Sequence, residues 1–305
     1  MKPAVLFVFI CILITSSNCH REKGINGVNE LSQELLKIIN DAPGTIGIAF
    51  VSDKDTICFN NGVQFPMMSV FKLHQSIATI HSLEAISTPL DTLLLIKRGE
   101  IDENTWSPML KDYSGSEFFV SVKELLKYTI ESSDNNASNI LFKRIISPDS
   151  TNLFIKSIAQ DSTFNIACSE SQMKEYHDLS YYNFTSPLSA ALLIRQVFKD
   201  SLCLQENQEF LQKALLHVTT GSDRLGAILS NDNNLFFAHK TGSGYRNSRN
   251  ELIAHNDIGY FRLPDNQDYA LAVFIRDFHG TENKASSIIA SISAVIYSYI
   301  TSALK

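Results

Sequence analysis

Three short motifs carry residues whose types and spacing could do chemistry on an acyl group. In chain order they are Ser69-Val70-Phe71-Lys72, Ser133-Asp134-Asn135 and Lys240-Thr241-Gly242. A serine hydroxyl is a weak nucleophile, so it needs a neighbouring base and donors for the oxyanion that forms. If Ser69 begins a helix, Lys72 lies one turn further on the same face, and free N–H groups point at the hydroxyl. The first motif therefore predicts a serine nucleophile beside a lysine.

The second motif lies between two helical segments and supplies polar groups for the same reaction. Ser133 is placed to relay a proton to a leaving nitrogen, and Asn135 to hydrogen-bond an amide of the substrate. Asp134 is expected to fix the loop. Serine, aspartate and asparagine are also common helix caps, so the motif has a structural interpretation beside the catalytic one.

The third motif ends an apolar run, 236–239, that is typical of a strand. Lys240 offers a cation to a substrate carboxylate. Gly242 keeps side-chain bulk out of the cleft, and the N–H of Ser243 can join that of Ser69 as an oxyanion hole. Because all three motifs occur in one order, a chance match is improbable.

Glu170 distinguishes between the reactions that such a serine could perform. Hydrolysis of an acyl-enzyme requires an activated water, and a carboxylate beside the ester is a suitable general base. With this base the site is that of a hydrolase. Without it, the same serine would serve a D-alanyl-D-alanine peptidase, or a sensor whose acyl-enzyme persists. The structural alternative is that Glu170 is a solvated surface acid.

Hydrophobic periodicity predicts the elements that position these motifs. Helical segments are expected at 29–39, 71–83, 122–129, 137–146, 188–198 and 285–299, and strands at 45–51, 56–59, 235–239, 257–262 and 269–276. This order predicts an α+β fold, an antiparallel sheet flanked by helices with an inserted all-α lobe. We expect residues 27–65 and 215–305 to form the α/β lobe and residues 66–214 the all-α lobe.

Composition restricts the class of partner. The chain has 305 residues, of which 44% are hydrophobic and 19% charged, as in ordinary globular proteins. The net charge is −6, and no dense lysine or arginine cluster could follow a nucleic-acid backbone. The eight histidines show no spacing typical of a metal site, so the expected chemistry requires no metal or other cofactor. With no long apolar heptad, a monomer is expected.

The first residues indicate export. Lys2 precedes an apolar run from Ala4 to Ile14 and a short polar stretch, the pattern of a signal peptide over residues 1–19. The run is shorter than the roughly 20 residues of a membrane-spanning helix. Cys19 is a candidate for a lipid anchor. The cysteines beyond it form an odd set, Cys58, Cys168 and Cys203, which indicates small buried side chains and no disulfide framework.

Four segments resemble the cephalosporin-hydrolysing class A β-lactamases of Bacteroides-type bacteria, the CfxA-like enzymes. They are 65–72, 105–110, 133–139 and 238–242, and the three motifs are those of class A β-lactamases and penicillin-binding proteins. The resemblance implies a periplasmic enzyme that acts on a small β-lactam and water. It implies catalytic roles for Ser69, Lys72, Ser133, Glu170 and Ser243, and substrate binding by Asn135, Lys240, Thr241, Gly242, Arg224 and Trp106.

The resemblance leaves structural alternatives at two of these positions and departs from the family at a third. Trp106 corresponds to an aromatic gatepost of the cleft, but could be a core tryptophan. Arg224 is similar to an arginine that assists carboxylate binding, but could form a surface salt bridge. Lys174 stands where many class A enzymes have asparagine beside the hydrolytic water. Its cation could pair with Glu170 and weaken that base, pair with Glu175, or point to solvent.

Overall fold

The structure is a computed structural model that describes residues 18–230 and 235–302. The apolar run of the expected signal peptide lies outside these ranges. Helix α1 begins at Asn18 and ends at Asn40, so it starts earlier than periodicity predicts. Gly24 and Gly27 lie in its first part, and glycine is a poor helix former, which hides this part from a pattern-based prediction. Cys19 lies in the first turn, and its side chain is outside the described part.

The largest sheet is antiparallel and has five strands, in the order β2-β1-β10-β9-β8. Its strands are β1 (Thr45–Ser52), β2 (Thr56–Phe59), β8 (Phe236–Ser243), β9 (Leu252–Arg262) and β10 (Asp268–Phe278). The third motif is the end of the edge strand β8, where Lys240 pairs with Ile258 and Ser243 with His255. The sheet therefore presents this motif along one edge.

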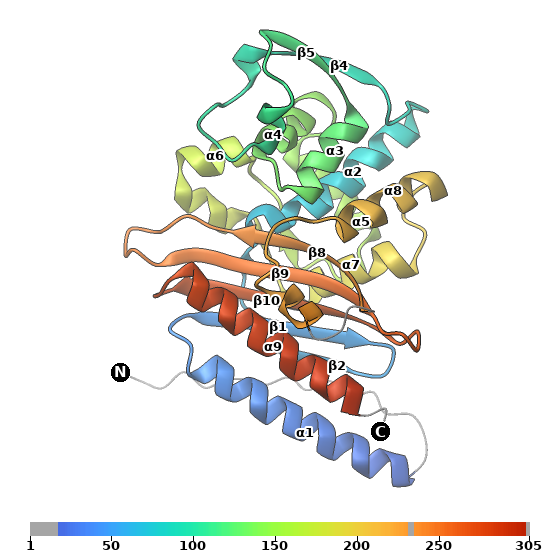
Figure 1. Cartoon of the computed structure of the whole chain (residues 1–305), viewed down its shortest axis with the longest axis vertical. Coiled ribbons are helices and arrows are strands. Elements are labelled where there is room, and N and C mark those ends of the chain that lie inside the picture. The colour runs from blue at the N-terminus through green and yellow to red at the C-terminus, as the bar shows by residue number, and fades with distance from the viewer. Residues whose placement is uncertain (1–17, 231–234, 303–305) are drawn as a thin grey trace.

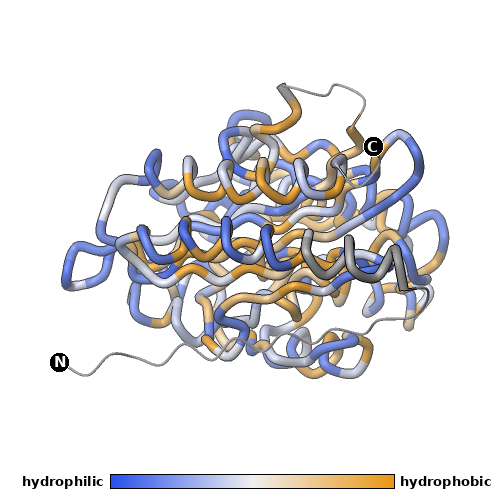
Figure 2. Tube along the Cα trace, turned by 90° about the horizontal axis from the view of Figure 1, so that it is seen from below, coloured by the Kyte–Doolittle hydropathy of each residue, from blue (hydrophilic) through white to orange (hydrophobic). Residues whose placement is uncertain are grey.

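Alternation along the strands divides the apolar residues between two faces. Ile46, Ile48 and Phe50 of β1 belong to the cluster under α1 and α9 (Glu282–Ser302), whereas Ala49 and Val51 belong to the other cluster. Figure 1 shows α1 and α9 together on one side of the sheet, and Figure 2 shows hydrophobic strands behind a largely hydrophilic outer side of α1. Because successive side chains of a strand point to opposite faces, both sheet faces are covered.

The other face carries helix α7 (Pro187–Lys199) and, beyond it, the helical block. A Cβ on Gly47 of β1 would lie 2.4 Å from the Phe65 ring and 2.7 Å from Pro187. The glycine therefore lets the start of α7 approach the sheet closely. Since α7 belongs to the middle segment yet packs on the sheet, the division into two lobes at residues 66–214 stays a prediction.

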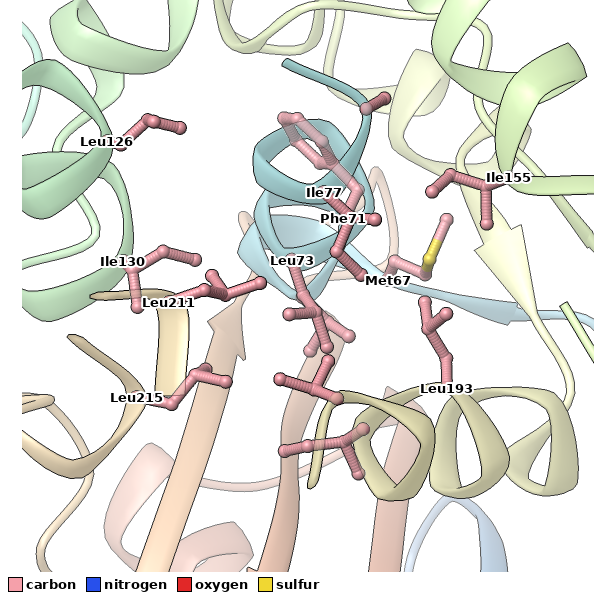
Figure 3. Packing of buried hydrophobic residues seen from close by; sticks show 14 of the residues in the cluster. Met67, Phe71, Leu73, Ile77, Leu126, Ile130, Ile155, Leu193, Leu211 and Leu215 are labelled. Carbon is pink, nitrogen blue, oxygen red and sulfur yellow. The ribbon is translucent and has the colours of Figure 1, made fainter. Parts of the chain in front are cut away.

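Helix α2 (Phe71–Ala85) runs through the centre of the helical block and carries the first motif at its start. Figure 3 shows Phe71, Leu73 and Ile77 of this helix surrounded by Leu126, Ile130, Ile155, Leu193, Leu211 and Leu215 from neighbouring helices. Its flanks are α3 (Val122–Glu131), α4 (Asn135–Arg144), α5 (Pro148–Ile158) and α8 (Gln205–Leu216). A buried central helix holds its own first turn rigidly, which suits a nucleophile.

Short elements complete the described chain. They are β3 (Phe65–Pro66), β4 (Leu93–Lys97), β5 (Glu117–Ser121), β6 (Phe164–Asn165), α6 (Glu170–Glu175), β7 (Phe184–Thr185) and the 3₁₀ helices η1 (Met68–Val70), η2 (Arg98–Glu100), η3 (Pro108–Lys111), η4 (His177–Tyr182) and η5 (Leu225–Ser230). The predicted α+β class, with an antiparallel sheet flanked by helices, is confirmed. Among the described helices, α9 is long and apolar enough to cross a membrane, but it buries Ile289, Ile292 and Ile296 against the sheet.

Candidate active site

Ser69 lies in a tight turn at the entrance to α2. It is the middle residue of the 3₁₀ helix η1, which runs directly into α2, so Lys72 is the second residue of the helix. Met68 has a φ of 45°, a left-handed conformation that costs free energy in a residue with a side chain. The Asn256 side chain donates to the backbone carbonyls of Pro66 at 2.8 Å and Met67 at 3.2 Å. These bonds hold the strained turn that presents Ser69.

The Glu170 carboxylate accepts a hydrogen bond from the hydroxyl of Ser69. The Ser69 Oγ donates to Glu170 Oε1 across 3.0 Å, although the residues are 101 positions apart. Glu170 is the first residue of α6, Ser169 caps that helix, and only 4% of Glu170 is exposed. Because Glu170 is buried and bonded to Ser69, it is not a solvated surface acid.

Lys72 is fully buried, and its ammonium nitrogen contacts three oxygen acceptors. They are the backbone carbonyl of Ser133 at 2.7 Å, Oδ1 of Asn135 at 2.7 Å and Oε1 of Glu170 at 2.9 Å. An ammonium group has three donors, so this geometry uses all of them. Lys72 therefore ties the nucleophile turn to both the second motif and Glu170.

The second motif forms the turn between α3 and α4. Ser133 has a φ of 57°, and Asp134 caps α4 by accepting from the backbone N–H of Ala137. Asp134 is fully buried and also accepts from the Ser107 hydroxyl and the Met109 N–H. Burial raises the pKa of its carboxyl, which these hydrogen bonds partly offset. The structural interpretation of the motif as a helix cap is confirmed, and the cap is compatible with the predicted catalytic role because it holds Ser133 in place.

Lys240 is fully buried and lies behind the cleft wall. Its ammonium donates to the Ser133 Oγ at 2.9 Å and to the Thr241 carbonyl at 3.2 Å. Burial lowers the pKa of Lys240 well below its ordinary value, and the nearby Lys72 cation lowers it further. We expected Lys240 to offer its cation to a substrate carboxylate. The structure places the Ser133 hydroxyl directly on that cation.

Gly242 faces the nucleophile turn and not the open cleft. A Cβ at this position would lie 2.3 Å from the backbone oxygen of Met67, and 3.2 and 3.3 Å from side-chain carbons of Val70 and Met68. A backbone oxygen cannot yield as a flexible side chain can. The glycine is therefore required for close packing of β8 against η1, a reason that differs from the expected one.

Arg224 is buried beneath the end of β8 and contacts Ser243. Its guanidinium donates to the Ser243 hydroxyl at 2.6 Å and to the Asn256 carbonyl at 2.8 Å. Burial lowers the pKa of Arg224, against which the Asp257 carboxylate acts. With 7% exposure, Arg224 is not part of a surface salt bridge.

These elements enclose a cleft between the helical block and β8, with a cavity of about 340 Å³. It is lined by Ser69, Trp106, Ser133, Asn135, Glu170, Thr241 and Ser243 of the expected site, and also by Met68, Asn104, Thr105, Lys174, Thr220, Gly244 and Tyr245. Lys72, Lys240, Gly242 and Arg224 support the wall from behind. Trp106 is 60% exposed, so it is not a core tryptophan. Its indole N–H donates to the Ser132 carbonyl at 2.8 Å.

Several lining residues carried no recognised sequence signal. The Thr220 and Thr241 hydroxyls lie 2.6 Å apart, and the turn at Gly221 has a φ of 73° that glycine adopts easily. The Thr220-Gly221 pair could have indicated such a turn, but not its contact with β8. Tyr245 stacks on His177, and burial raises the pKa of its hydroxyl to about 12. Across the described residues, no cluster of His, Cys, Asp and Glu is arranged to hold a metal ion.

Lys174 does not contact Glu170 or Glu175. Its ammonium lies 2.5 Å from Oδ2 of Asp102, which precedes the cavity-lining residues Asn104, Thr105 and Trp106 in the chain. That hydrogen bond lowers the pKa of Asp102. The sequence offered Glu170, Glu175 or solvent as surroundings for the Lys174 cation, and its pairing with Asp102 was not predicted.

The fold and this arrangement of a serine, buried lysines and a carboxylate define the class of serine acyl-transferring enzymes. The sequence model of the beta-lactamase enzyme family matches residues 30–300. The chain therefore belongs to the β-lactamase enzyme family, and it is a β-lactam hydrolase with the class A fold.

Individual relatives agree with this assignment. A beta-lactamase of Phocaeicola vulgatus is 44% identical over 273 residues, which cover 89% of this chain and 85% of the relative. The extended-spectrum beta-lactamase PER-1 of Pseudomonas aeruginosa is 31% identical over 272 residues, covering 88% and 87%. The crystal structure of a class A beta-lactamase from Bacteroides cellulosilyticus superposes with a TM-score of 0.84 at 32% identity, covering 90% of this chain and 99% of that one.

Proposed function

We propose that the protein hydrolyses β-lactams, cephalosporins in preference, through an acyl-enzyme on Ser69, and so confers β-lactam resistance. The observation that carries the proposal is the hydrogen bond from the Ser69 hydroxyl to Glu170, beside a Lys72 whose three donors are already used. Two features support the cephalosporin preference: the resemblance of the motif segments to cephalosporin-hydrolysing enzymes and the likeness to a relative named an extended-spectrum beta-lactamase.

In acylation, Glu170 is the base. It takes the hydroxyl proton of Ser69, the serine oxygen bonds to the lactam carbonyl carbon, and the ring C–N bond breaks. Either Lys72 or Glu170 was a candidate for this role on sequence grounds. The 3.0 Å distance between Ser69 Oγ and Glu170 Oε1 favours Glu170. The Lys72 ammonium contacts the same carboxylate oxygen and stabilises its negative charge.

The ring nitrogen receives its proton from Ser133. Lys240 donates to the Ser133 oxygen, so it stabilises the negative charge that develops there as the proton leaves. The proton that Glu170 took from Ser69 returns to Ser133 through water in the cleft, and Glu170 ends acylation as a carboxylate. The oxyanion is held by the backbone N–H groups of Ser69 and Ser243.

Deacylation uses the same carboxylate. Lys72 and Ser69 both contact Oε1 of Glu170, and within the described part of the chain no group bonds Oε2. Oε2 is therefore the oxygen that orients and deprotonates a water. The hydroxide attacks the ester carbon, the bond to the Ser69 oxygen breaks, and that oxygen takes the proton that Glu170 removed from the water, which restores the carboxylate.

The substrate carboxylate is bound by hydroxyl groups backed by buried cations. Ser133, Thr241 and Ser243 line the cleft, and behind them Lys240 contacts Ser133 and Arg224 contacts Ser243. A cation that donates to a hydroxyl makes that hydroxyl a better donor to an anion. Asn135 is proposed to bind the substrate side-chain amide, and the exposed Trp106 to form one lip of the cleft.

The proposed cellular location of the enzyme rests on its first residues. We propose export to the periplasm after removal of residues 1–19, with lipid attachment at Cys19 as an additional anchor. The mature protein is proposed to act as a monomer without a membrane segment, a nucleic-acid partner or a cofactor. Mass spectrometry of the protein from cell fractions would test both the cleavage point and the lipid.

Turnover and trapping together test the reaction. We would follow hydrolysis of a chromogenic cephalosporin and of benzylpenicillin by the wild type, Ser69→Ala and Glu170→Gln, with mass spectra of each mixture. The expected result is multiple turnovers in the wild type, none in Ser69→Ala, and in Glu170→Gln a slowly formed adduct on Ser69 that then persists, because the variant lacks the base of both steps. Glu103→Gln, an exposed acid outside the cleft, is the matched control.

Each step has its own contrary result. A wild type that stops after one equivalent with a persistent adduct would favour the peptidase or sensor. Unchanged turnover in Glu170→Gln would contradict the assignment of the base. A higher kcat/KM for benzylpenicillin would contradict the cephalosporin preference alone.

A further inference from the structure

Lys174 spans one end of the cleft. It lies in the last turn of α6, lines the same cavity as Glu170, and bonds Asp102, which is 72 positions away in the chain and two residues before the cavity-lining Asn104. Both side chains of the pair are 33% exposed. An exposed ion pair contributes little to stability, so a stabilising role does not account for this contact by itself.

Asp102 is held independently of Lys174. The Asn136 side chain accepts from the Asp102 N–H and donates to the Asp102 carbonyl, both at 2.9 Å. Oδ1 of Asp102 accepts from the backbone N–H of Asn104 at 2.8 Å, which leaves Oδ2 to face Lys174. Asn136 directly follows Asn135, the partner of Lys72. The carboxylate is thus a fixed point attached to the catalytic turn.

The spacing of Lys174 and Glu170 on α6 makes an alternative pairing easy. Residues four apart on a helix are neighbours, and a carboxylate that precedes a lysine by four positions is the favourable order. A second cation on Glu170, beside Lys72, would stabilise the carboxylate and make it a poorer proton acceptor. It would also occupy the place of the hydrolytic water.

We propose that the Asp102–Lys174 ion pair is a positioning device for deacylation, which holds the Lys174 ammonium away from Glu170 and ties α6 to the segment that carries Asp102. Asp102 and Lys174 are positioning residues, since they act through Glu170. The inference rests on the proposed function, because it concerns the hydrolytic step of the same site.

Other charged groups also face Glu170 and are unchanged in the test below. Lys72 contacts it from α2, Lys240 acts on it electrostatically from β8, and the neutral Tyr245 lines the same cavity. A variant at Asp102 leaves all of these in place. A change in the pH profile that depends on Lys174 can therefore be assigned to Lys174.

The experiment compares Asp102→Asn, Lys174→Met and the double variant in the full protein. In Asp102→Asn, where Lys174 is released, we expect deacylation to slow about tenfold and its acid limb to move about one pH unit lower. Acylation, measured from the pre-steady-state burst, uses the same carboxylate and should also slow, but by less than deacylation, because the displaced water is needed only for deacylation. The double variant should return the acid limb to the wild-type position, because the cation is gone.

The outcomes separate the inference from the proposed function. An acid limb that is the same in Asp102→Asn and the wild type, or one that stays displaced in the double variant, would overturn the positioning role. A loss shared equally by all three variants, with unmoved pH profiles, would mean a structural tie only and would also overturn it. A wild type without turnover would remove the proposed function first. Glu103→Gln, next to Asp102, controls for a loop charge change, and thermal unfolding checks that each variant is folded.

Discussion

His74 should make the stability of this enzyme fall steeply in mild acid. The side chain lies on α2, two positions after Lys72, and is fully buried. Burial lowers its pKa from 6.5 to about 3, and the carbonyl of Val70 opposes this shift weakly. A base with a lowered folded pKa stays neutral in the native state, while the unfolded chain binds a proton below pH 6.5. Stability is therefore complete above that pH and is lost as the pH falls towards about 3.

The magnitude follows from the difference between the two pKa values. Each unit corresponds to about 1.36 kcal/mol, so at about pH 5, which is about 1.5 units below the unfolded pKa, the loss is about 2 kcal/mol. Substituting His74→Met should remove this contribution and leave stability near neutral pH within about 1 kcal/mol, because methionine fills irregular space well. The assay is urea denaturation followed by circular dichroism at about pH 7 and about pH 5.

A difference between variants isolates this residue from the acids that titrate in the same range. His81→Met, an exposed histidine on the same helix, is the matched control and should keep the wild-type loss. If His74→Met loses as much stability as the wild type between the two pH values, the reasoning from burial is refuted. His255 should give a parallel effect, since burial also lowers its pKa to about 3.

Two further predictions concern the wall formed by β8. Gly242→Ala should lose about 1–3 kcal/mol of stability and most activity, because its Cβ would lie 2.3 Å from the Met67 carbonyl oxygen; Gly62→Ala, which meets nothing within 4 Å, should lose neither. Arg224→Lys should raise KM about tenfold with a smaller change in kcat, because a lysine cannot donate to Ser243 and the Asn256 carbonyl in the same fork. Chemical denaturation and steady-state kinetics check these, and an unchanged KM in Arg224→Lys would contradict the role of the buried cation.

Local pattern was sufficient for helix α2 and strand β2, but it ended strand β8 at 239 whereas the strand runs from Phe236 to Ser243 and includes the third motif. Helix α2 begins at Phe71 as predicted, and β2 has the predicted bounds of Thr56 and Phe59. In both, the apolar residues alternate or repeat without interruption. Strand β9 is different: it was expected from Asp257 but begins at Leu252. His255 and Asn256 interrupt its apolar pattern, yet both are buried, because Nε2 of His255 pairs with the Ser286 hydroxyl and the Asn256 amide donates to the carbonyls of Pro66 and Met67.

The partners of the site residues were beyond sequence reasoning. A motif predicts a function for Lys240, but its burial behind Ser133 depends on how the turn between α3 and α4 lies against β8, a contact between residues 107 positions apart. Lys174 is a similar case. Its sequence neighbours include Glu170 and Glu175, and its actual partner is set by the loop that Asn136 holds. Spacing along a helix gives the candidates for pairing, whereas tertiary packing selects among them.

The strained residues of the site explain why its supporting groups are so extensively bonded. Met68 precedes the proposed nucleophile and Ser133 is the proposed proton donor, and both have left-handed backbone conformations that cost about 1–3 kcal/mol each. Each is held by a buried polar side chain: Asn256 bonds the carbonyls before Met68, and Asp134 bonds three separate groups beside Ser133. Burying an amide and a carboxylate is unfavourable unless they are fully paired. Because the hydrogen bonds satisfy these groups and fix the strained turns together, both serine hydroxyls stay in place before a substrate arrives.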